Sequence, residues 1–198
     1  SKKLDAIVIS AHHDHVGTRI DGDRFNGADD NASGTAGLLE LAEAFAKTNA
    51  RPARSIIFLS VSGEELGLWG SAYYADHPTW PKKRITANIN IDMIGRAGRE
   101  QQVIQMQITP SHSHAKYSSI VRNAVRLGQQ FDIAFTSGDT YYRRSDHYNF
   151  AKIGIPVVFF CDGEHPDYHQ VTDHADKLDF AAMESIVRLA YWTAWQTA

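Results

Sequence analysis

The chain has 198 residues, of which 43% are hydrophobic and 22% are charged, values that are ordinary for one globular domain with a sizeable core. Its formal net charge of -3 excludes the basic excess typical of proteins that bind nucleic acid or anionic membranes. The single cysteine, Cys161, excludes an intrachain disulfide, and no apolar run approaches the roughly 20 residues that cross a bilayer. We therefore expect one domain over residues 1–198 that binds neither nucleic acid nor a membrane.

Strands and helices are expected to alternate along the chain. Strands are predicted from short apolar or alternating runs, and helices from apolar residues spaced three or four apart. In chain order, the expected elements are a strand at 4–11, a helix at 33–47, a strand at 54–61, a helix at 65–76, strands at 86–91 and 102–108, a helix at 113–128, strands at 131–135 and 155–160, and a helix at 180–195. This alternation predicts an α/β fold, a three-layer sandwich in which helices flank a central, largely parallel mixed sheet.

Side chains that bind metals follow four of the predicted strands. They are His12, His13, Asp14 and His15 after the first strand, Glu64 and Glu65 after the second, Asp92 after the third, and Asp162, Glu164, His165, Asp167 and His169 after the strand near residue 158. In open α/β sheets, sites form beyond the carboxyl ends of the strands, so folding can gather these groups into one cleft. A further contributor, Asp30, lies just before the first helix, where backbone amides favour anions.

Each of these residues also has an ordinary structural explanation when it is taken alone. The run at residues 29–31 suits a turn followed by a helix cap, and the Glu64-Glu65 pair suits the solvated start of a helix. A lone Asp92 after a strand would be structural, and a lone His12 would be packed or on the surface. A site is favoured because all of these residues lie at strand ends, in an order that supplies a complete set of metal ligands.

Six stretches of the sequence resemble the M-twenty-eight metallopeptidases, a family of zinc aminopeptidases with two catalytic metal ions. The stretches are AHHDHVG (11–17), FNGADDNASGTA (25–36), SGEELGLWGS (62–71), NIDMIG (90–95), RSDHYNFAKIGIPVVFF (144–160) and HPDYHQVTDHADKLD (165–179). They cover most of the chain in the family's order, and they are most similar to secreted bacterial members. The resemblance implies the zinc aminopeptidase fold (phosphorylase/hydrolase-like), a peptide substrate and a secreted or periplasmic location.

The resemblance also implies a ligand set for two Zn²⁺ ions per chain. His12 and Asp92 would bind one zinc, Glu65 and His169 would bind the other, and Asp30 would bridge both. The two ions carry four positive charges and the three carboxylates carry three negative charges, so a bridging hydroxide would neutralise the centre. This balance supports two metals without a surplus of buried charge.

Further roles come from the same resemblance. Glu64 would be the general base that takes a proton from the bridging water and passes it to the leaving amine. Asp14 would orient His12, and Tyr168 would donate a hydrogen bond to the tetrahedral intermediate. The peptide bond that precedes Asn31 is expected to be cis.

Three further expectations concern the surroundings of the site. Asp146 and His147 match a family motif and are given a supporting role only. His13 is expected not to bind metal, because adjacent residues in a strand point to opposite faces. Catalytic domains of the family usually have more strands or helices before the motif at residues 11–17, so we expect a smaller sheet or an exposed sheet edge here.

These features predict an aminopeptidase that prefers hydrophobic terminal residues. Aromatic residues near the site favour a pocket for the terminal side chain, although such residues also build cores; they are Trp69, Tyr141, Tyr142 and Phe160. One alternative is a carboxypeptidase of the same family, in which Arg143 and Arg144 would bind the substrate carboxylate. The other alternative is a metal-binding interaction domain without catalysis.

Overall fold

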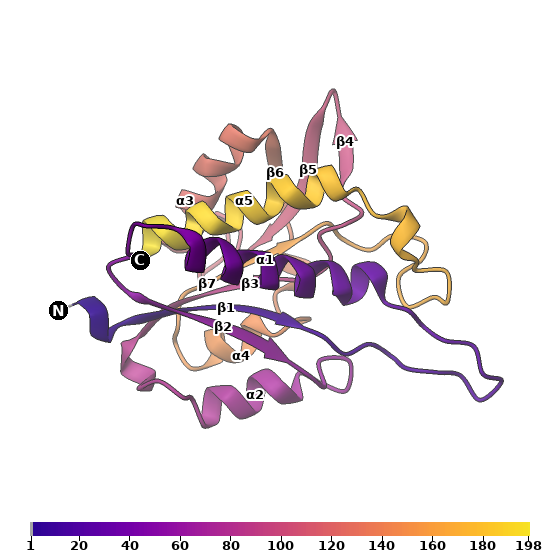
Figure 1. Cartoon of the computed structure of the whole chain (residues 1–198), viewed down its shortest axis with the longest axis horizontal. Helices are drawn as coiled ribbons and strands as arrows, with labels where there is room; N and C mark the ends of the chain where they lie inside the picture. The colour runs from indigo at the N-terminus through magenta and orange to yellow at the C-terminus, as the bar shows by residue number, and fades with distance from the viewer. Residues whose placement is uncertain (1) are drawn as a thin grey trace.

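The strands of the computed structural model, which describes residues 2–198, form one seven-stranded sheet (Figure 1). The strands are β1 (Ala6–His12), β2 (Ser55–Val61), β3 (Ile85–Ile91), β4 (Gly98–Glu100), β5 (Val103–Thr109), β6 (Ile133–Ser137) and β7 (Val157–Cys161). Their order is β2-β1-β3-β7-β5-β4, and β6 pairs with β5. β2 is therefore an edge strand, and most of its side chains are only half-buried.

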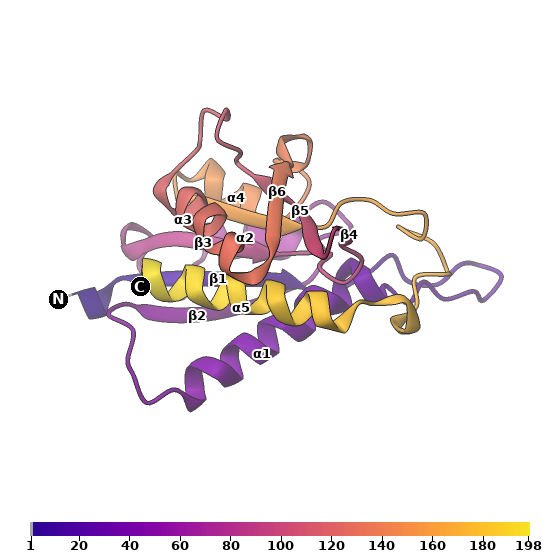
Figure 2. The same cartoon turned by 90° about the horizontal axis from the view of Figure 1, so that it is seen from above.

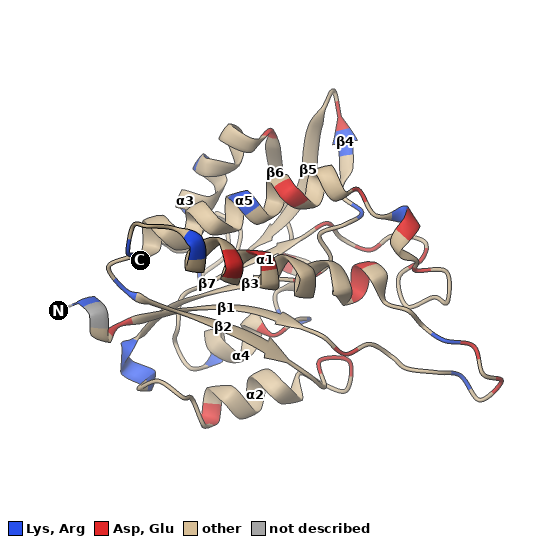
Figure 3. Ribbon diagram, viewed as in Figure 1, with Lys and Arg blue, Asp and Glu red and all other residues tan. Residues whose placement is uncertain are grey.

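The sheet is mixed and largely parallel, as the sequence predicts. β1 runs parallel to β2 and β3, β3 runs parallel to β7, and β5 runs parallel to β6. β5 is antiparallel to both β7 and β4. The carboxyl ends of β1, β2, β3 and β7 consequently meet at one edge of the sheet, and Figure 3 shows acidic residues in the loops at this edge.

Helices cover both faces of the sheet, which confirms the three-layer arrangement (Figures 1 and 2). The helices are α1 (Gly34–Lys47), α2 (Trp69–Asp76), α3 (Ser119–Gly128), α4 (His147–Lys152) and α5 (Phe180–Thr197). The helices α1, α3 and α5 pack over one face, and α2 and α4 pack over the other. Among the described residues, none of the helices has the length and apolar character needed to cross a membrane.

Strand β1 shows how the sequence produces these layers. All seven of its residues are buried, because side chains on both of its faces contact helices. Ile7 and Ile9 join the cluster under α1 and α5, whereas Val8 joins the cluster that contains Tyr74 and Phe150 on the opposite face. A strand that is buried on both faces has a continuous run of apolar residues, which is why the sequence predicts β1.

Several element bounds differ from those predicted. Helix α2 begins at Trp69 and not at residue 65, because Gly67 and Leu68 have φ angles of 112° and 63° that a helix does not accommodate. Similarly, Asp132 has a φ of 55°, so β6 begins after it. The short elements β4 and α4 were not predicted, since three exposed residues and a six-residue helix carry too little hydrophobic periodicity.

Candidate metal centre

The five predicted metal ligands lie together at the carboxyl edge of the sheet. They are His12 at the end of β1, Asp30 in the turn before α1, Glu65 after β2, Asp92 after β3 and His169 in the loop after β7. Parallel pairing of the strands brings these positions to one place although they are up to 157 residues apart in the chain.

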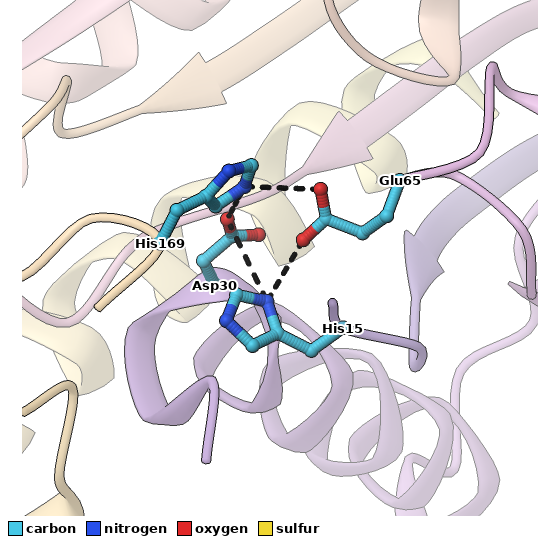
Figure 4. A group of neighbouring side chains, drawn as sticks. All are labelled: His15, Asp30, Glu65 and His169. Atoms are coloured by element: carbon cyan, nitrogen blue, oxygen red, sulfur yellow. Dashed lines mark ion pairs between the residues drawn. The ribbon is translucent and has the colours of Figure 1, made fainter. Parts of the chain in front are cut away.

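The donor atoms of the predicted ligands form two adjacent groups that share Asp30, called the first and second metal groups below. In the first group, His12 Nε2 lies 3.4 Å from Asp30 Oδ1 and 3.3 Å from Asp92 Oδ1. In the second group, His169 Nε2 lies 3.0 Å from Asp30 Oδ2 and 3.0 Å from Glu65 Oε2 (Figure 4). Each carboxylate oxygen of Asp30 therefore faces a different group, which is the arrangement that a bridging ligand needs.

A sixth side chain, His15, belongs to the second group, and sequence reasoning did not assign it. Its Nδ1 lies 2.8 Å from Glu65 Oε1 and 3.8 Å from Asp30 Oδ2 (Figure 4). The clustering of three histidines at residues 12–15 was the only signal in the sequence, and it did not distinguish His15 from its neighbours. His13 is exposed, and its Nδ1 lies 2.9 Å from Ser60 Oγ, outside both groups as expected.

The donor atoms of these groups fit metal ions. Several are buried and have no hydrogen-bond partner within the described part of the chain: His12 Nε2, His169 Nε2, Asp92 Oδ1 and Glu65 Oε1. Buried polar atoms in proteins are normally satisfied, so a set of them that converges is itself evidence for a ligand. Within each group the donors lie within 4.8 Å of one another, and imidazole nitrogens with carboxylate oxygens are the ligands of catalytic zinc.

The turn that carries Asp30 is fixed by side chains from distant segments. The Asp173 carboxylate accepts hydrogen bonds from the backbone N–H groups of Asp29 at 2.9 Å and Asp30 at 3.2 Å. Asn31 Oδ1 accepts a hydrogen bond from the backbone N–H of Met93 at 3.1 Å, directly after Asp92. The peptide bond between Asp30 and Asn31 is cis, as expected. These contacts tie the turn that carries Asp30 to the end of β3.

The charges of the site perturb one another. Burial alone would lower the pKa of His12, but the charge of Asp92 and the adjacent carboxylates of Asp14 and Asp30 outweigh it and raise that pKa well above its usual value. The adjacent carboxylates of Asp30 and Glu65 raise the pKa of His169 to about 10. In the metal-free chain, both imidazoles therefore hold protons that a metal ion must displace.

Asp14 lies on the far side of the His12 ring. His12 Nδ1 is 3.1 Å from the backbone oxygen of Asp14 and 3.6 Å from its carboxylate Oδ1. The opposite ring nitrogen faces Asp30 and Asp92. A partner at one nitrogen fixes both the tautomer and the orientation of a ligating imidazole, and Asp14 is placed to do this.

Glu64 faces a cavity that opens beside the two groups. The cavity is lined by Asp30, Glu64 and Asp92 on the metal side and by Met93, Tyr141, Arg144, Ser145, Phe159, Cys161, Gly163, Glu164 and Tyr168 around it. Burial and, next, the charge of Asp92 raise the pKa of Glu64 to about 9. This carboxyl group takes part in neither metal group, so it is free to exchange protons.

The aromatic lining differs from the one predicted. Of the four predicted aromatic residues, only Tyr141 lines this cavity. Phe160 is fully buried in the core, and Trp69 is 61% exposed. Phe159 lines the cavity in place of Phe160, because successive side chains of β7 point to opposite faces of the sheet. Tyr142 packs against another surface hollow, beside Pro156.

Tyr168 also lines the cavity, and its ring stacks on that of His169 with centroids 3.9 Å apart. Arg144 Nη2 donates a hydrogen bond to the Tyr168 hydroxyl at 3.3 Å. Burial and the Asp30 charge raise the pKa of Tyr168 above its usual value, so the hydroxyl keeps its proton at neutral pH. It can therefore donate a hydrogen bond to a bound molecule.

Asp146 and His147 are fully buried beside the site but belong to neither metal group. The His147 ring stacks on Phe159 with centroids 4.4 Å apart. Burial lowers the pKa of His147 to about 3, so the ring is neutral, and burial raises the pKa of Asp146 to about 6. The contact with Phe159 places His147 behind the cavity wall.

Residues 1–193 of the sequence match the profile of Peptidase family M28. The chain belongs to this family. It is similar to Aminopeptidase YwaD of Bacillus subtilis, with 30% identity over 185 residues that cover 89% of this chain and 38% of that protein. The site described above thus lies in a metallopeptidase fold whose relatives include a named aminopeptidase.

Solved structures agree with this assignment. The LapA aminopeptidase of Legionella pneumophila superposes with a TM-score of 0.80 at 27% identity, covering 98% of this chain and 51% of that one. BSAP, a zinc aminopeptidase from Bacillus subtilis, superposes with a TM-score of 0.79 at 25% identity, covering 100% of this chain and 47% of that one. These matches confirm the predicted fold. The chain spans about half the length, or less, of these relatives.

Proposed function

We propose that this chain is the catalytic part of a zinc-dependent aminopeptidase that removes N-terminal residues from peptides. The observation that carries the proposal is the position of Asp30, whose two carboxylate oxygens face two separate groups of imidazole and carboxylate donors. Membership of Peptidase family M28 and the similarity to named aminopeptidases support it.

In this proposal, each chain would bind two zinc ions. His12 and Asp92 would hold one ion, Glu65 and His169 would hold the other, and Asp30 would contribute to both sites. When bound, zinc supplies Lewis acidity, which polarises a carbonyl group and lowers the pKa of water. The three carboxylates offset three of the four positive charges of the pair, which supports two ions in place of one.

Glu64 is the proposed general base. It takes a proton from the attacking water as the new C–O bond forms, and it returns that proton to the leaving nitrogen as the C–N bond breaks. Its support is its place in the cavity, beside both metal groups but in neither. Its pKa of about 9 in the metal-free chain arises from burial and the charge of Asp92, and two bound cations would oppose both effects.

The cavity wall suits a hydrophobic terminal side chain. Met93, Phe159 and Cys161 form an apolar cluster there, with Tyr141 and Tyr168 packed against it. Pockets that bind small apolar groups are lined in this way, with a few polar groups to fix orientation. Tyr168 is the polar group that we assign to the developing oxyanion, because its protonated hydroxyl lies at the cavity wall.

A carboxypeptidase is the second candidate, because Arg144 also lines the cavity. Its guanidinium, however, already pairs with the Glu164 carboxylate at 2.6 Å. A substrate carboxylate would have to displace that partner. Arg143 lies over the ring of Tyr148 and offers no second cation to the cavity. These contacts favour a free amine over a free carboxylate as the recognised terminus.

The test is release of chromophore from leucine p-nitroanilide by the purified chain. Turnover should stop after treatment with a chelator and return when zinc is restored, and N-acetyl-leucine p-nitroanilide should not be cleaved. An N-blocked dipeptide with a free carboxylate serves as the carboxypeptidase substrate. Cleavage of that dipeptide alone would replace aminopeptidase by carboxypeptidase activity, and tight zinc binding without any turnover would favour the interaction domain.

We also propose that the protein acts outside the cytoplasm, on extracellular or periplasmic peptides. The support is the likeness of its motifs to those of secreted bacterial members of the family. Fractionation of the source cells, followed by detection of the protein with an antibody, tests the location. Recovery from the cytoplasmic fraction alone would refute it.

A further inference from the structure

We propose that His15 is a fourth protein ligand of the second metal group, beside Asp30, Glu65 and His169. The inference rests on the proposed function only in that this group binds zinc. It adds an imidazole that the ligand set inferred from the sequence does not contain. The second group would then hold its ion with two imidazoles and two carboxylates, which is the number of donors that zinc normally takes.

The geometry of the ring places a nitrogen among the other donors. His15 Nδ1 lies 2.8 Å from Glu65 Oε1 and 3.8 Å from Asp30 Oδ2, and its ring centroid is 5.5 Å from that of His169. One donor atom from each of the four residues lies within 4.8 Å of all the others. Figure 4 shows both imidazoles directed at the two carboxylates.

The environment of His15 leaves its ring without another role. The side chain is only 9% exposed, and within residues 2–198 neither ring nitrogen makes a hydrogen bond, since Nδ1 meets Glu65 only as an ion pair. A buried imidazole nitrogen without a hydrogen bond is costly, and a metal ion at Nδ1 would remove that cost. His13, two positions earlier, is exposed and has a hydroxyl partner in Ser60. The two histidines therefore differ in both burial and hydrogen bonding.

The neighbouring turn makes room for the His15 ring. Gly27 has a φ of 59°, and a Cβ atom at this position would lie 2.6 Å from His15 Cγ. A Cβ atom at Gly27 would also meet the backbone oxygen of Asp30, so the turn or the His15 ring would have to shift. The ring of Phe25 makes an edge contact with the His15 ring, with ring centroids 6.4 Å apart. Gly27 and Phe25 thus confine the ring to the position in which Nδ1 faces the carboxylates.

The two metal groups would then differ in coordination. The first has three protein donors, His12, Asp30 and Asp92, and keeps room for a non-protein ligand, as catalytic zinc sites do. The second has four protein donors and resembles a closed site. We expect the ion of the second group to be held more tightly, and loss of His15 to weaken that ion selectively. Even residues outside the ligand set contribute about 10–100-fold to metal affinity, so a ligand should contribute at least as much.

The experiment counts imidazoles on zinc by X-ray absorption. The purified chain loaded with two equivalents of zinc should show three imidazoles per two zinc ions, from His12, His15 and His169. His15→Ala should show two, and His13→Ala, the matched control, should keep three. Competition with a chromophoric chelator should then give a loss of roughly 100-fold in the affinity of one zinc ion in His15→Ala, with little change in His13→Ala.

Two imidazoles in the unsubstituted chain would overturn the inference, and that measurement does not depend on whether the variant folds. A weaker ion in His15→Ala without loss of an imidazole would also overturn it, because His15 would then only position Glu65. If the unsubstituted chain hydrolyses leucine p-nitroanilide but has two imidazoles, only this inference fails. If it binds no zinc at all, the proposed function fails with it.

Discussion

The hydroxyl of Ser145 donates a hydrogen bond of 2.6 Å to Oδ2 of Asp92, leaving Oδ1 of that carboxylate to face His12. Ser145 in turn accepts a hydrogen bond from Asn90 Nδ2 at 2.9 Å, and Asn90 Oδ1 accepts one from the Ser10 hydroxyl at 2.6 Å. All of these side chains are buried. A directional chain of hydrogen bonds therefore runs from the middle of the sheet to Asp92, a predicted metal ligand, and fixes the orientation of its carboxylate.

Ser145→Ala should weaken zinc binding. The substitution frees Oδ2 of Asp92 and leaves Asn90 Nδ2 as a buried donor without an acceptor. We expect zinc affinity to fall about 10–100-fold, as for other residues that orient ligands. We also expect a loss of about 1–3 kcal/mol in the free energy of unfolding of the metal-free chain. Chelator competition and urea denaturation measure the two effects.

The matched control is Ser119→Ala, at the exposed first residue of α3 and outside both metal groups. It should leave zinc affinity unchanged and alter the free energy of unfolding by no more than about 0.5 kcal/mol, as exposed substitutions usually do. Unchanged zinc affinity in Ser145→Ala, together with lower stability, would mean that the chain of hydrogen bonds only supports the fold.

Glu64→Gln should remove most of the turnover while the zinc remains. An amide cannot accept the proton of the attacking water, and general base catalysis is worth about 10²–10⁴-fold in rate. We expect kcat to fall by that factor and the zinc content to stay unchanged, measured with leucine p-nitroanilide and by metal analysis. Glu100→Gln, on the exposed strand β4, makes the same chemical change away from the site and should keep full activity. Similar activity in the two variants would exclude Glu64 as the base.

Zinc binding to the chelator-stripped chain should release protons. The adjacent carboxylates of Asp30 and Glu65 raise the pKa of His169 to about 10, so the ring is charged at pH 7, whereas zinc requires its neutral form. The affinity for zinc should therefore rise with pH between 6 and 8. Titration calorimetry in buffers of different ionisation enthalpy measures the number of protons released. A binding enthalpy that does not depend on the buffer would contradict this prediction.

The metal-free chain should also lose stability as the pH rises. The folded pKa of His169, about 10, lies above the value of 6.5 expected for the unfolded chain, and that of Glu64, about 9, lies above 4.5. The folded state therefore binds more protons, and its stability falls with increasing pH. The stabilising contribution of His169 is complete below pH 6.5 and disappears toward pH 10. The charge of Glu64 destabilises the folded state progressively as the pH rises from 4.5 to 9. The midpoint of thermal unfolding, measured from pH 6 to 10 with and without zinc, should fall more steeply without it.

The sequence was sufficient for the long elements, because buried strands appear as apolar runs. It also singled out the five residues that the structure brings together, through their places at strand ends or before the first helix and through the family resemblance. His15 lies beyond the end of β1, where alternation no longer tells which way a side chain points. The choice between Phe159 and Phe160 required the pleat of β7, which a run of apolar residues does not define. The hydrogen bond from Ser145 to Asp92 joins residues 53 positions apart and has no local signature.

Gly34→Ala should destabilise the chain, although alanine favours helices. Gly34 begins α1, where alanine would gain about 1 kcal/mol of intrinsic helix propensity. A Cβ atom there would collide with Asn31 Oδ1 and lie 2.6 Å from the backbone oxygen of Ile91. Asn31 Oδ1 accepts the hydrogen bond from Met93 N–H that ties the turn of Asp30 to β3, so the collision falls on a fixed group.

Overpacking of this kind costs about 1–3 kcal/mol, which exceeds the gain in propensity, so we expect a lower midpoint in urea and weaker zinc binding for Gly34→Ala. Gly98→Ala is the control, since a Cβ atom at that exposed glycine meets nothing within 4 Å. It should be neutral or stabilise the fold by about 0.4–1 kcal/mol. If Gly34→Ala were as stable as Gly98→Ala, the turn that holds Asp30 would be able to move aside, and its rigid placement between the two metal groups would not be required for folding.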